Sequence, residues 1–224
     1  MAVRSKVYYT NSGREKGTMQ MIIYFIRHGV TDQNKKKCLQ GRSDIELNEY
    51  GRELAQKTAE RLKDVKFDMI FTSPLKRAAE TAEIIKGDRE IPIIPEERII
   101  EISFGEYEGL SFGNETYNIP DPDFMNFFQA PEKYRVPPGG ESFEEVIKRT
   151  GEFLEELKKR ESYQDKTILL STHGCALKAL LANIKGISIA EFWGEGVHKN
   201  CAVSIVEYKD GEYQLLEEGK VYYS

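Results

Sequence analysis

The chain has 224 residues, a formal net charge of −5 and a sequence pI near 5.5. This length accommodates one α/β domain with a substantial core, and the acidic balance argues against a general nucleic-acid or membrane-surface binder. The cysteines share no metal-ligand spacing and number only three, so a disulfide framework is not expected and a reducing, cytoplasmic compartment is favoured.

The first 20 residues differ in character from the rest of the chain. They contain no long apolar stretch, so neither a signal peptide nor a transmembrane helix fits. The polar run at 10–18 has no regular period, and we expect residues 1–20 to be a disordered extension. Because residues 13–17 can be encoded by a purine-rich tract that binds ribosomes, our hypothesis is that the native chain starts at Met19 or Met21.

Short apolar runs that predict strands recur along residues 21–224. Residues 22–26 are rich in β-branched and aromatic types, typical of a strand buried on both faces. Residues 69–72 and 167–172 are further strands of this kind. The run at 91–94 contains a proline, which favours the edge of a sheet.

Helical patterns lie between these runs. Asn48 is predicted to cap a helix that reaches about residue 63. Ser73 and Pro74 are typical of a helix start, with Ser73 as the cap and Pro74 at the first helical position. Apolar residues recur at helical spacing over 143–157.

The end of the chain predicts one more helix at 176–184 and a hairpin over 202–216 that closes the fold. Together these elements predict an α/β fold: a three-layer sandwich with a mostly parallel central sheet flanked by helices. We expect residues 21–224 to form a single domain.

Residues 111–140 interrupt this regular pattern with interleaved aromatic residues and prolines. A long irregular insertion in a compact domain is usually a lid or binding loop, so we expect substrate selectivity here. The alternative is a surface segment packed by its own aromatic side chains.

Basic and imidazole side chains follow three of the predicted strands. Arg27 and His28 follow the first strand, Arg77 follows the second, and His173 comes directly after the strand at 167–172. Ligands of open α/β sheets bind outside the carboxyl ends of the strands, so we expect these side chains to converge. Guanidinium and imidazole groups in one place suit an anionic ligand.

Three motifs contain these residues, and a fourth, at 100–109, lies between the second and the last of them. They are RHGVTDQN at 27–34, SPLKRAAETA at 73–82, IEISFGEYEG at 100–109 and THG at 172–174. In this order they resemble the histidine phosphatase family, also called phosphoglycerate mutase-like, over about residues 21–210. The interval between the third and fourth motifs is similar to that of the phosphatase branch.

The resemblance implies a phosphomonoesterase that hydrolyses a small phosphate ester through a phosphohistidine intermediate. A neutral His28 can attack phosphorus and divide one substitution into two easier steps. Arg27, Arg77 and His173 would bind the phosphoryl oxygens, as the resemblance also implies.

One carboxyl group would protonate the leaving group and then activate water. The residues alone leave Glu101, Glu106 and Glu108 open for this role, and the family pattern favours Glu101.

Asn34, Gln40, Gly41 and Gly174 complete the predicted site as substrate-binding residues. The turn at 40–44 contains a glycine that would let backbone amides approach a ligand. We predict no metal and no cofactor, because clustered metal-ligand spacings are missing and the arginines would repel a cation.

Two other functions fit the same resemblance: a cofactor-dependent phosphoglycerate mutase and a non-catalytic, phosphate-binding regulatory module. The module would be expected to lack a nucleophile or acid, and both are present here. The partner expected from the sequence is a small phosphate ester, with no nucleic acid and no membrane, while the physiological substrate and the oligomeric state do not follow from these residues.

Overall fold

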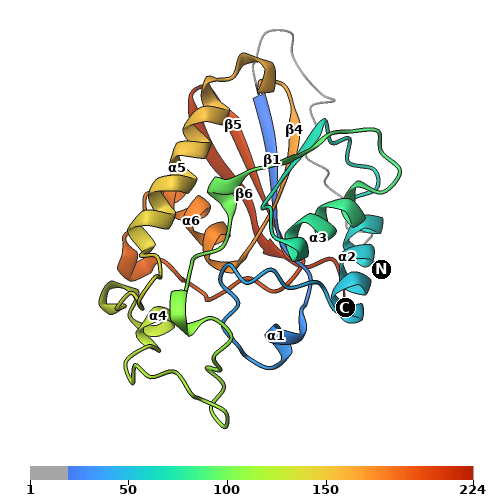
Figure 1. Cartoon of the computed structure of the whole chain (residues 1–224). Coiled ribbons are helices and arrows are strands. Elements are labelled where there is room, and N and C mark those ends of the chain that lie inside the picture. The colour runs from blue at the N-terminus through green and yellow to red at the C-terminus, as the bar shows by residue number, and fades with distance from the viewer. Residues whose placement is uncertain (1–19, 224) are drawn as a thin grey trace, which may run out of the picture.

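The computed structural model describes residues 20–223, and its centre is a six-stranded sheet in the order β3-β2-β4-β1-β5-β6 (Figure 1). The strands are β1 (Gln20–Arg27), β2 (Met69–Thr72), β3 (Ile93–Pro95), β4 (Thr167–Thr172), β5 (Val203–Lys209) and β6 (Glu212–Lys220). β3, β2, β4 and β1 run parallel, β5 pairs antiparallel with β1, and β6 pairs antiparallel with β5 at the other edge. The predicted mostly parallel sheet is therefore confirmed, with β3 at one edge as expected.

The expectations for the first residues of the chain lie outside the described part. This holds for the disordered extension up to residue 19 and for the hypothesis about the starting methionine. β1 begins at Gln20, two residues before the apolar run, and Met21 is fully buried in it.

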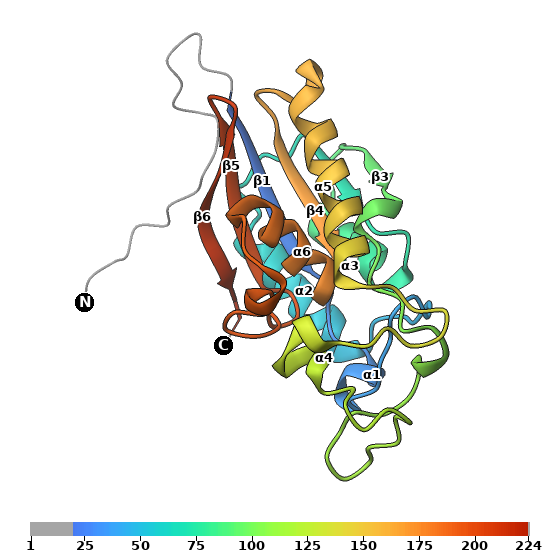
Figure 2. The ribbon, with the colours of Figure 1, turned by 90° about the vertical axis from the view of Figure 1, so that its left-hand side faces the viewer.

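Helices cover both faces of the sheet (Figures 1 and 2). They are α1 (Asp32–Lys35), α2 (Glu49–Arg61), α3 (Lys76–Lys86), α4 (Asn126–Gln129), α5 (Phe143–Lys159) and α6 (Gly174–Lys185). Single 3-10 turns occur at Glu97–Ile99, Gly105–Tyr107, Pro131–Lys133, Glu161–Tyr163 and Ile189–Glu191. α2 and α3 pack on one face and α5 and α6 on the other, which is the predicted three-layer arrangement.

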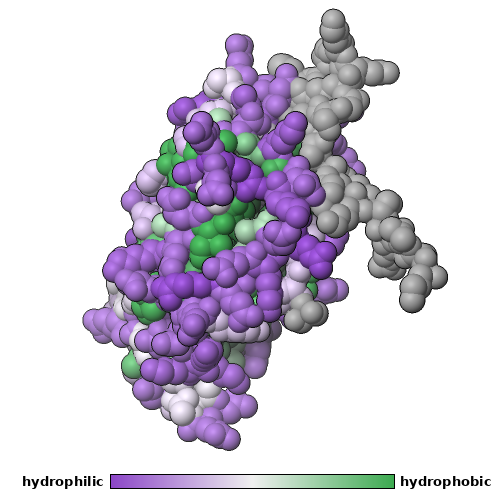
Figure 3. Space-filling model, turned by 90° about the vertical axis from the view of Figure 1, so that its right-hand side faces the viewer, coloured by the Kyte–Doolittle hydropathy of each residue, from purple (hydrophilic) through white to green (hydrophobic). Residues whose placement is uncertain are grey.

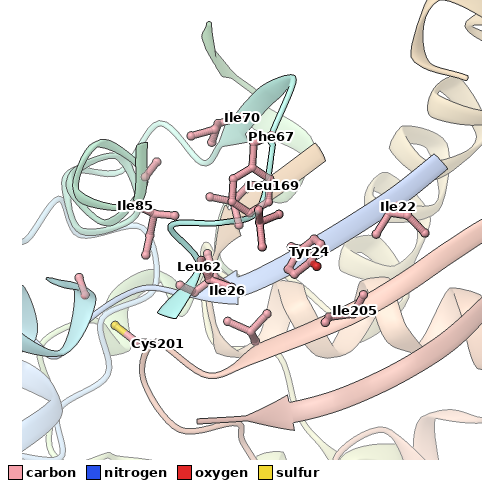
Figure 4. Close-up of a cluster of buried hydrophobic side chains, with 14 of the residues drawn as sticks. Ile22, Tyr24, Ile26, Leu62, Phe67, Ile70, Ile85, Leu169, Cys201 and Ile205 are labelled. Carbon is pink, nitrogen blue, oxygen red and sulfur yellow. The ribbon is translucent and has the colours of Figure 1, made fainter. Parts of the chain in front are cut away.

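Alternation along β1 sends side chains to two cores. Ile22, Tyr24 and Ile26 pack against α2 and α3, in the cluster shown in Figure 4. Met21, Ile23 and Phe25, on the opposite face, pack against α5 and α6. Burial on both faces explains why the sequence of this strand is continuously apolar.

Of the two predicted helix caps, the structure corrects one and confirms the other. Ser73 does not cap α3, because the helix begins at Lys76 and the Ser73 hydroxyl has other partners. Asp44 Oδ1 instead accepts from the first helical amide of Lys76 at 2.7 Å. Asn48 caps α2 as predicted, by accepting from Gly51 N at 2.8 Å.

Residues 111–140 contain α4 and one 3-10 turn, and their aromatic side chains are packed rather than loose. Phe124 and Phe127 are buried in a cluster with Phe143 at the start of α5 and Trp193 beyond α6. The segment is therefore fixed to the α5 and α6 layer by aromatic packing. Its role as a lid remains a prediction.

No helix within residues 20–223 is long and apolar enough to cross a membrane. On the face drawn in Figure 3, hydrophilic residues surround a smaller group of hydrophobic ones.

Candidate active site

The carboxyl ends of β1 and β4 bring two histidines together. Arg27 lies opposite Thr172 in the parallel register, so the next residues, His28 and His173, are neighbours across the two strands. Their ring centroids are 5.2 Å apart with planes tilted by 58°, and both side chains are buried. The predicted convergence of the two histidines is thus what the structure shows.

The His28 ring has one nitrogen engaged and one available. Its Nδ1 lies 2.6 Å from the carbonyl oxygen of Gly29. A carbonyl accepts only, so Nδ1 carries the ring proton and Nε2 keeps its lone pair in the neutral form. Burial, reinforced by Arg77 and Arg27, lowers the pKa of His28 well below its ordinary value of 6.5. The ring is therefore neutral near pH 7.

Arg77 is fully buried in the first turn of α3, as predicted. Its two Nη atoms donate to the carbonyl oxygens of Ser43 and Gly41, each at 2.7 Å. Burial lowers its pKa to about 10, so the guanidinium stays charged at neutral pH. Its Nε is buried and has no protein partner in the described chain.

Arg27 ends β1 beside His28. One Nη donates to the carbonyl oxygen of His198, and its buried Nε has no partner among residues 20–223. Burial lowers the pKa of Arg27, and the nearby Glu101 carboxylate opposes that shift.

His173 stands directly before α6, at its N-cap position. Its Nε2 lies 2.6 Å from Ser73 Oγ, whereas its buried Nδ1 has no protein partner within the described residues. Burial, followed by the charge of Arg77, lowers its pKa well below 6.5, so this ring is also neutral near pH 7.

Glu101 is held against the start of α6. Its Oε1 accepts from the backbone amides of Cys175 at 3.1 Å and Ala176 at 3.0 Å. A Cβ placed on Gly174 would lie 3.6 Å from Glu101 Oε2 and 3.6 Å from Arg27 Nε. The carboxylate and the guanidinium therefore border the same space.

The other two carboxylates that the sequence left open are elsewhere. Glu108 accepts from Arg42 N at 2.8 Å and from Ser43 Oγ at 2.6 Å, which fixes the turn that holds Arg77. Glu106 is exposed. Geometry therefore favours Glu101 for acid–base chemistry at the histidine pair.

A family model described as the histidine phosphatase superfamily (branch 1) matches residues 23–220. The chain belongs to the histidine phosphatase superfamily. An uncharacterized phosphatase of Bacillus subtilis, PhoE, is 36% identical over 164 residues, which are 73% of this chain and 77% of that protein. Phosphoserine phosphatase 1 of Hydrogenobacter thermophilus is 30% identical over 195 residues, or 87% of this chain and 90% of that protein.

The fold also agrees with that of a solved structure. Bacillus stearothermophilus YhfR matches with a TM-score of 0.81 and 36% sequence identity, over 89% of this chain and 97% of that chain.

The remaining predicted binding residues of this histidine phosphatase have protein partners near the start of α1 and at Arg77. Gln40 is buried, and its Oε1 accepts from Thr31 Oγ1 at 2.8 Å. The carbonyl oxygen of Gly41 accepts from Arg77 at 2.7 Å, while the approach of backbone amides in this turn to a ligand stays a prediction. Thr31 caps α1, and the side-chain oxygen of Asn34 completes the capping box by accepting from Thr31 N at 3.0 Å.

Sequence reasoning missed Asn200. Its Nδ2 donates to the carbonyl oxygens of His28 at 2.9 Å and Gly29 at 3.2 Å, and it lies 3.5 Å from Asn34 Oδ1. Asn200 follows no strand, and no local pattern marks it. The third histidine, His198, has a largely buried ring with Nε2 3.3 Å from Glu218 Oε1.

The assembled site is suited to an oxyanion. Five buried side-chain polar atoms in the described chain lack a protein partner, and three of them are Arg27 Nε, Arg77 Nε and His173 Nδ1. Two guanidinium groups and a neutral imidazole can surround a dianionic phosphoryl group with donors. No three His, Cys, Asp or Glu side chains among residues 20–223 form a group that could hold a metal ion.

Proposed function

We propose that this histidine phosphatase is a phosphomonoesterase that hydrolyses a small phosphate ester through a phosphohistidine at His28. The observation that carries the proposal is the bond from His28 Nδ1 to Gly29 O, because it leaves Nε2 as the nucleophilic atom. The unpaired donors of Arg27, Arg77 and His173 support it, since they belong to the residues around that ring.

In the first half-reaction, the Nε2 lone pair forms the N–P bond while the bond from phosphorus to the leaving oxygen breaks. Glu101 gives its proton to that oxygen, so the product leaves as an alcohol. Charge spreads over the three equatorial oxygens, where Arg27, Arg77 and His173 stabilise it.

In the second half-reaction, Glu101 takes a proton from water as the water oxygen attacks phosphorus. The N–P bond breaks, phosphate leaves, and His28 returns to its neutral form with its Nδ1 proton still bound to Gly29 O. Oε2 suits this exchange, because Oε1 is the oxygen that Cys175 and Ala176 bind most closely.

Two relatives described above support hydrolysis as the reaction. PhoE and phosphoserine phosphatase 1 are both named as phosphatases. The choice of leaving group depends on residues outside the phosphate site, because fold and phosphate site alone do not select it.

We also propose that residues 111–140 contribute to the choice of ester. Ser111 pairs with Cys38 in an isolated antiparallel bridge, so the segment starts beside the turn that carries Gln40 and Gly41.

The three unpaired cysteines support a reducing compartment such as the cytoplasm.

Trapping of the phosphoenzyme tests the mechanism. Incubation with p-nitrophenyl phosphate, followed by rapid quenching at alkaline pH and mass spectrometry, should place an acid-labile phosphoryl group on His28. His28→Ala should release no phosphate and take no label, while His198→Gln should still be labelled. A labelled His28→Ala protein would overturn the proposal.

A panel of substrates separates the alternatives. Phosphate release from a set of esters supports the phosphatase, and bisphosphoglycerate-dependent interconversion of phosphoglycerates would instead identify a mutase. Binding of phosphate without turnover would identify a regulatory module.

A further inference from the structure

The buried hydroxyl of Ser73 lies between the ends of β2 and β4. Its side chain is fully buried, and Oγ lies 2.6 Å from His173 Nε2. The backbone amide of Ser73 donates to Ser171 O at 2.9 Å, so the pairing of the two strands fixes the position of the hydroxyl. The contact therefore belongs to the sheet and not to a loose loop.

The partners of the Ser73 hydroxyl determine which atom donates in its hydrogen bond with His173 Nε2. Ser73 Oγ also accepts from Leu75 N at 3.4 Å, and these two groups are its partners within residues 20–223. If Nε2 carried the ring proton, the hydroxyl would accept twice and leave its own buried hydrogen unpaired, which is costly. The satisfied arrangement has Ser73 donating to an unprotonated Nε2.

This direction determines the tautomer of His173. A neutral imidazole has one protonated and one unprotonated nitrogen, so accepting at Nε2 places the proton on Nδ1. Nδ1 is the buried atom that has no protein partner in the described chain. Nδ1 is thus a hydrogen-bond donor in a neutral ring, beside His28 and Arg77.

We propose that Ser73 is a positioning residue that holds neutral His173 as the Nδ1–H tautomer, so that this ring donates a hydrogen bond to a phosphoryl oxygen. The proposal rests on the phosphatase function proposed above for its last step, while the tautomer itself does not depend on any substrate. Without the hydroxyl, the ring can also adopt the Nε2–H tautomer. In that tautomer Nδ1 presents a lone pair to the anion.

Nitrogen NMR tests the tautomer directly. The chain has three histidines, so the long-range nitrogen–proton spectrum of protein labelled with 15N-histidine contains three rings, assigned by His28→Gln and His198→Gln. Near pH 7.5, His173 should show a protonated Nδ1 and an unprotonated Nε2. Ser73→Ala should move the ring toward Nε2–H, and Ser73→Thr, which keeps the hydroxyl, should restore the original pattern.

Ser171→Ala is the matched control, because the buried Ser171 hydroxyl donates to Ala78 O at 2.8 Å and is not bonded to the imidazole. It should leave the tautomer unchanged. A wild-type spectrum with Nε2–H, or an Nδ1–H ring that persists in Ser73→Ala, would overturn the proposal, and the first result requires no variant to fold.

Phosphate binding and turnover test the consequence. Loss of the Nδ1 donor should weaken calorimetric binding of inorganic phosphate and lower kcat by roughly ten- to a hundredfold in Ser73→Ala, with Ser73→Thr recovering most of both. A changed tautomer with unchanged phosphate binding and kcat would overturn the role of Ser73 in anion binding. Absence of any ester hydrolysis by the wild-type protein, with the expected tautomers, would count against the phosphatase function alone.

Discussion

The imidazole rings of His28 and His173 lie 5.2 Å apart, centroid to centroid, and each has one nitrogen bound to a fixed oxygen. Gly29 O holds Nδ1 of the first ring, and Ser73 Oγ holds Nε2 of the second. The two rings therefore offer opposite nitrogens: a lone pair on Nε2 of His28 and a proton on Nδ1 of His173. A nucleophile and a donor are the two functions that phosphoryl transfer needs from this pair.

Acid should destabilise the fold through these rings. Burial first, and then Arg77, keep the pKa of both histidines below 6.5 in the folded protein, so below about pH 6.5 the unfolded chain binds protons that the folded chain cannot bind. The contribution of the two neutral rings to the free energy of unfolding is therefore fully present above about pH 6.5. Below that pH the free energy of unfolding decreases, by up to about 1.4 kcal/mol per pH unit for each ring.

Urea unfolding between about pH 7.5 and about pH 5.5 measures this effect. The double variant His28→Gln, His173→Gln should show a shallower decrease than wild type, because its site no longer titrates. Equal slopes in the two proteins would mean that these rings are not held neutral by the fold.

Arg77→Lys should reduce kcat by on the order of a hundred- to a thousandfold, the usual cost of one preorganised donor in a transition-state site. Lysine keeps a charge but cannot bridge the carbonyl oxygens of Gly41 and Ser43 in the way the guanidinium does. Steady-state kinetics on the best ester, with urea unfolding in parallel, separates lost catalysis from lost stability.

Arg89→Lys is the control for that substitution. The Arg89 guanidinium also donates to backbone carbonyls, those of Ile85, Lys86, Leu62 and Lys63, but it lies outside the pocket. We expect it to lose roughly 1–3 kcal/mol of stability with kcat unchanged. Similar decreases of kcat in Arg77→Lys and Arg89→Lys would contradict a specific role of Arg77 in catalysis.

The sequence was sufficient to predict the sheet, its helical layers and the meeting of Arg27, His28, Arg77 and His173. Parallel strands end at one edge, so residues that follow them must converge, and the register of β1 with β4 makes the two histidines neighbours. The residues alone did not single out Glu101 among the three candidate carboxylates for the acid–base role. The family pattern favoured it, and the structure shows that its amide partners come from α6, far along the chain.

Two supporting contacts could not be predicted from local patterns. Ser73 before Pro74 has the local pattern of a helix cap, but its hydroxyl is bonded to an imidazole 100 residues away. Asn200 reaches His28 because β5 pairs antiparallel with β1 and brings the preceding loop back to the end of that strand. Both contacts depend on strand pairing, which residue spacing does not encode.

Gly41→Ala should impair both stability and catalysis. Gly41 has φ +50, where an L-residue costs roughly 1–2 kcal/mol, and a Cβ there would stand 2.2 Å from Glu108 Oε1. Displacing Glu108 releases Ser43, whose carbonyl holds Arg77. We expect kcat/KM to fall on the order of tenfold or more in addition to the loss of stability.

Gly211→Ala isolates the backbone cost, because Gly211 has φ +88 in the β5–β6 turn and open space around its Cβ position. It should lose about 1 kcal/mol of stability with full activity. If Gly41→Ala were as active as Gly211→Ala, Glu108 would not be needed to hold the turn.

Asn200→Ala should lower kcat by roughly ten- to a hundredfold with a smaller change in KM, because Asn200 positions the nucleophile without a role in binding the leaving group. The variant removes the Asn200 side-chain donor from the carbonyl oxygens of His28 and Gly29, and Gly29 O is the acceptor that fixes the His28 ring. Removing the positive end of the amide dipole also favours the imidazolium form, so the acidic limb of the kcat/KM profile should move to higher pH.

Asn183→Ala provides the comparison for Asn200→Ala. In the wild-type protein the Asn183 Nδ2 also donates hydrogen bonds, to Ile147 O, Thr150 Oγ1 and Ala179 O. These bonds lie within the α5 and α6 layer and do not reach the histidine pair. The Asn183→Ala variant should lose stability and keep both kcat and the pH profile of wild type. A pH profile that moves equally in both variants would show that general loosening, and not the contact at Gly29, controls His28.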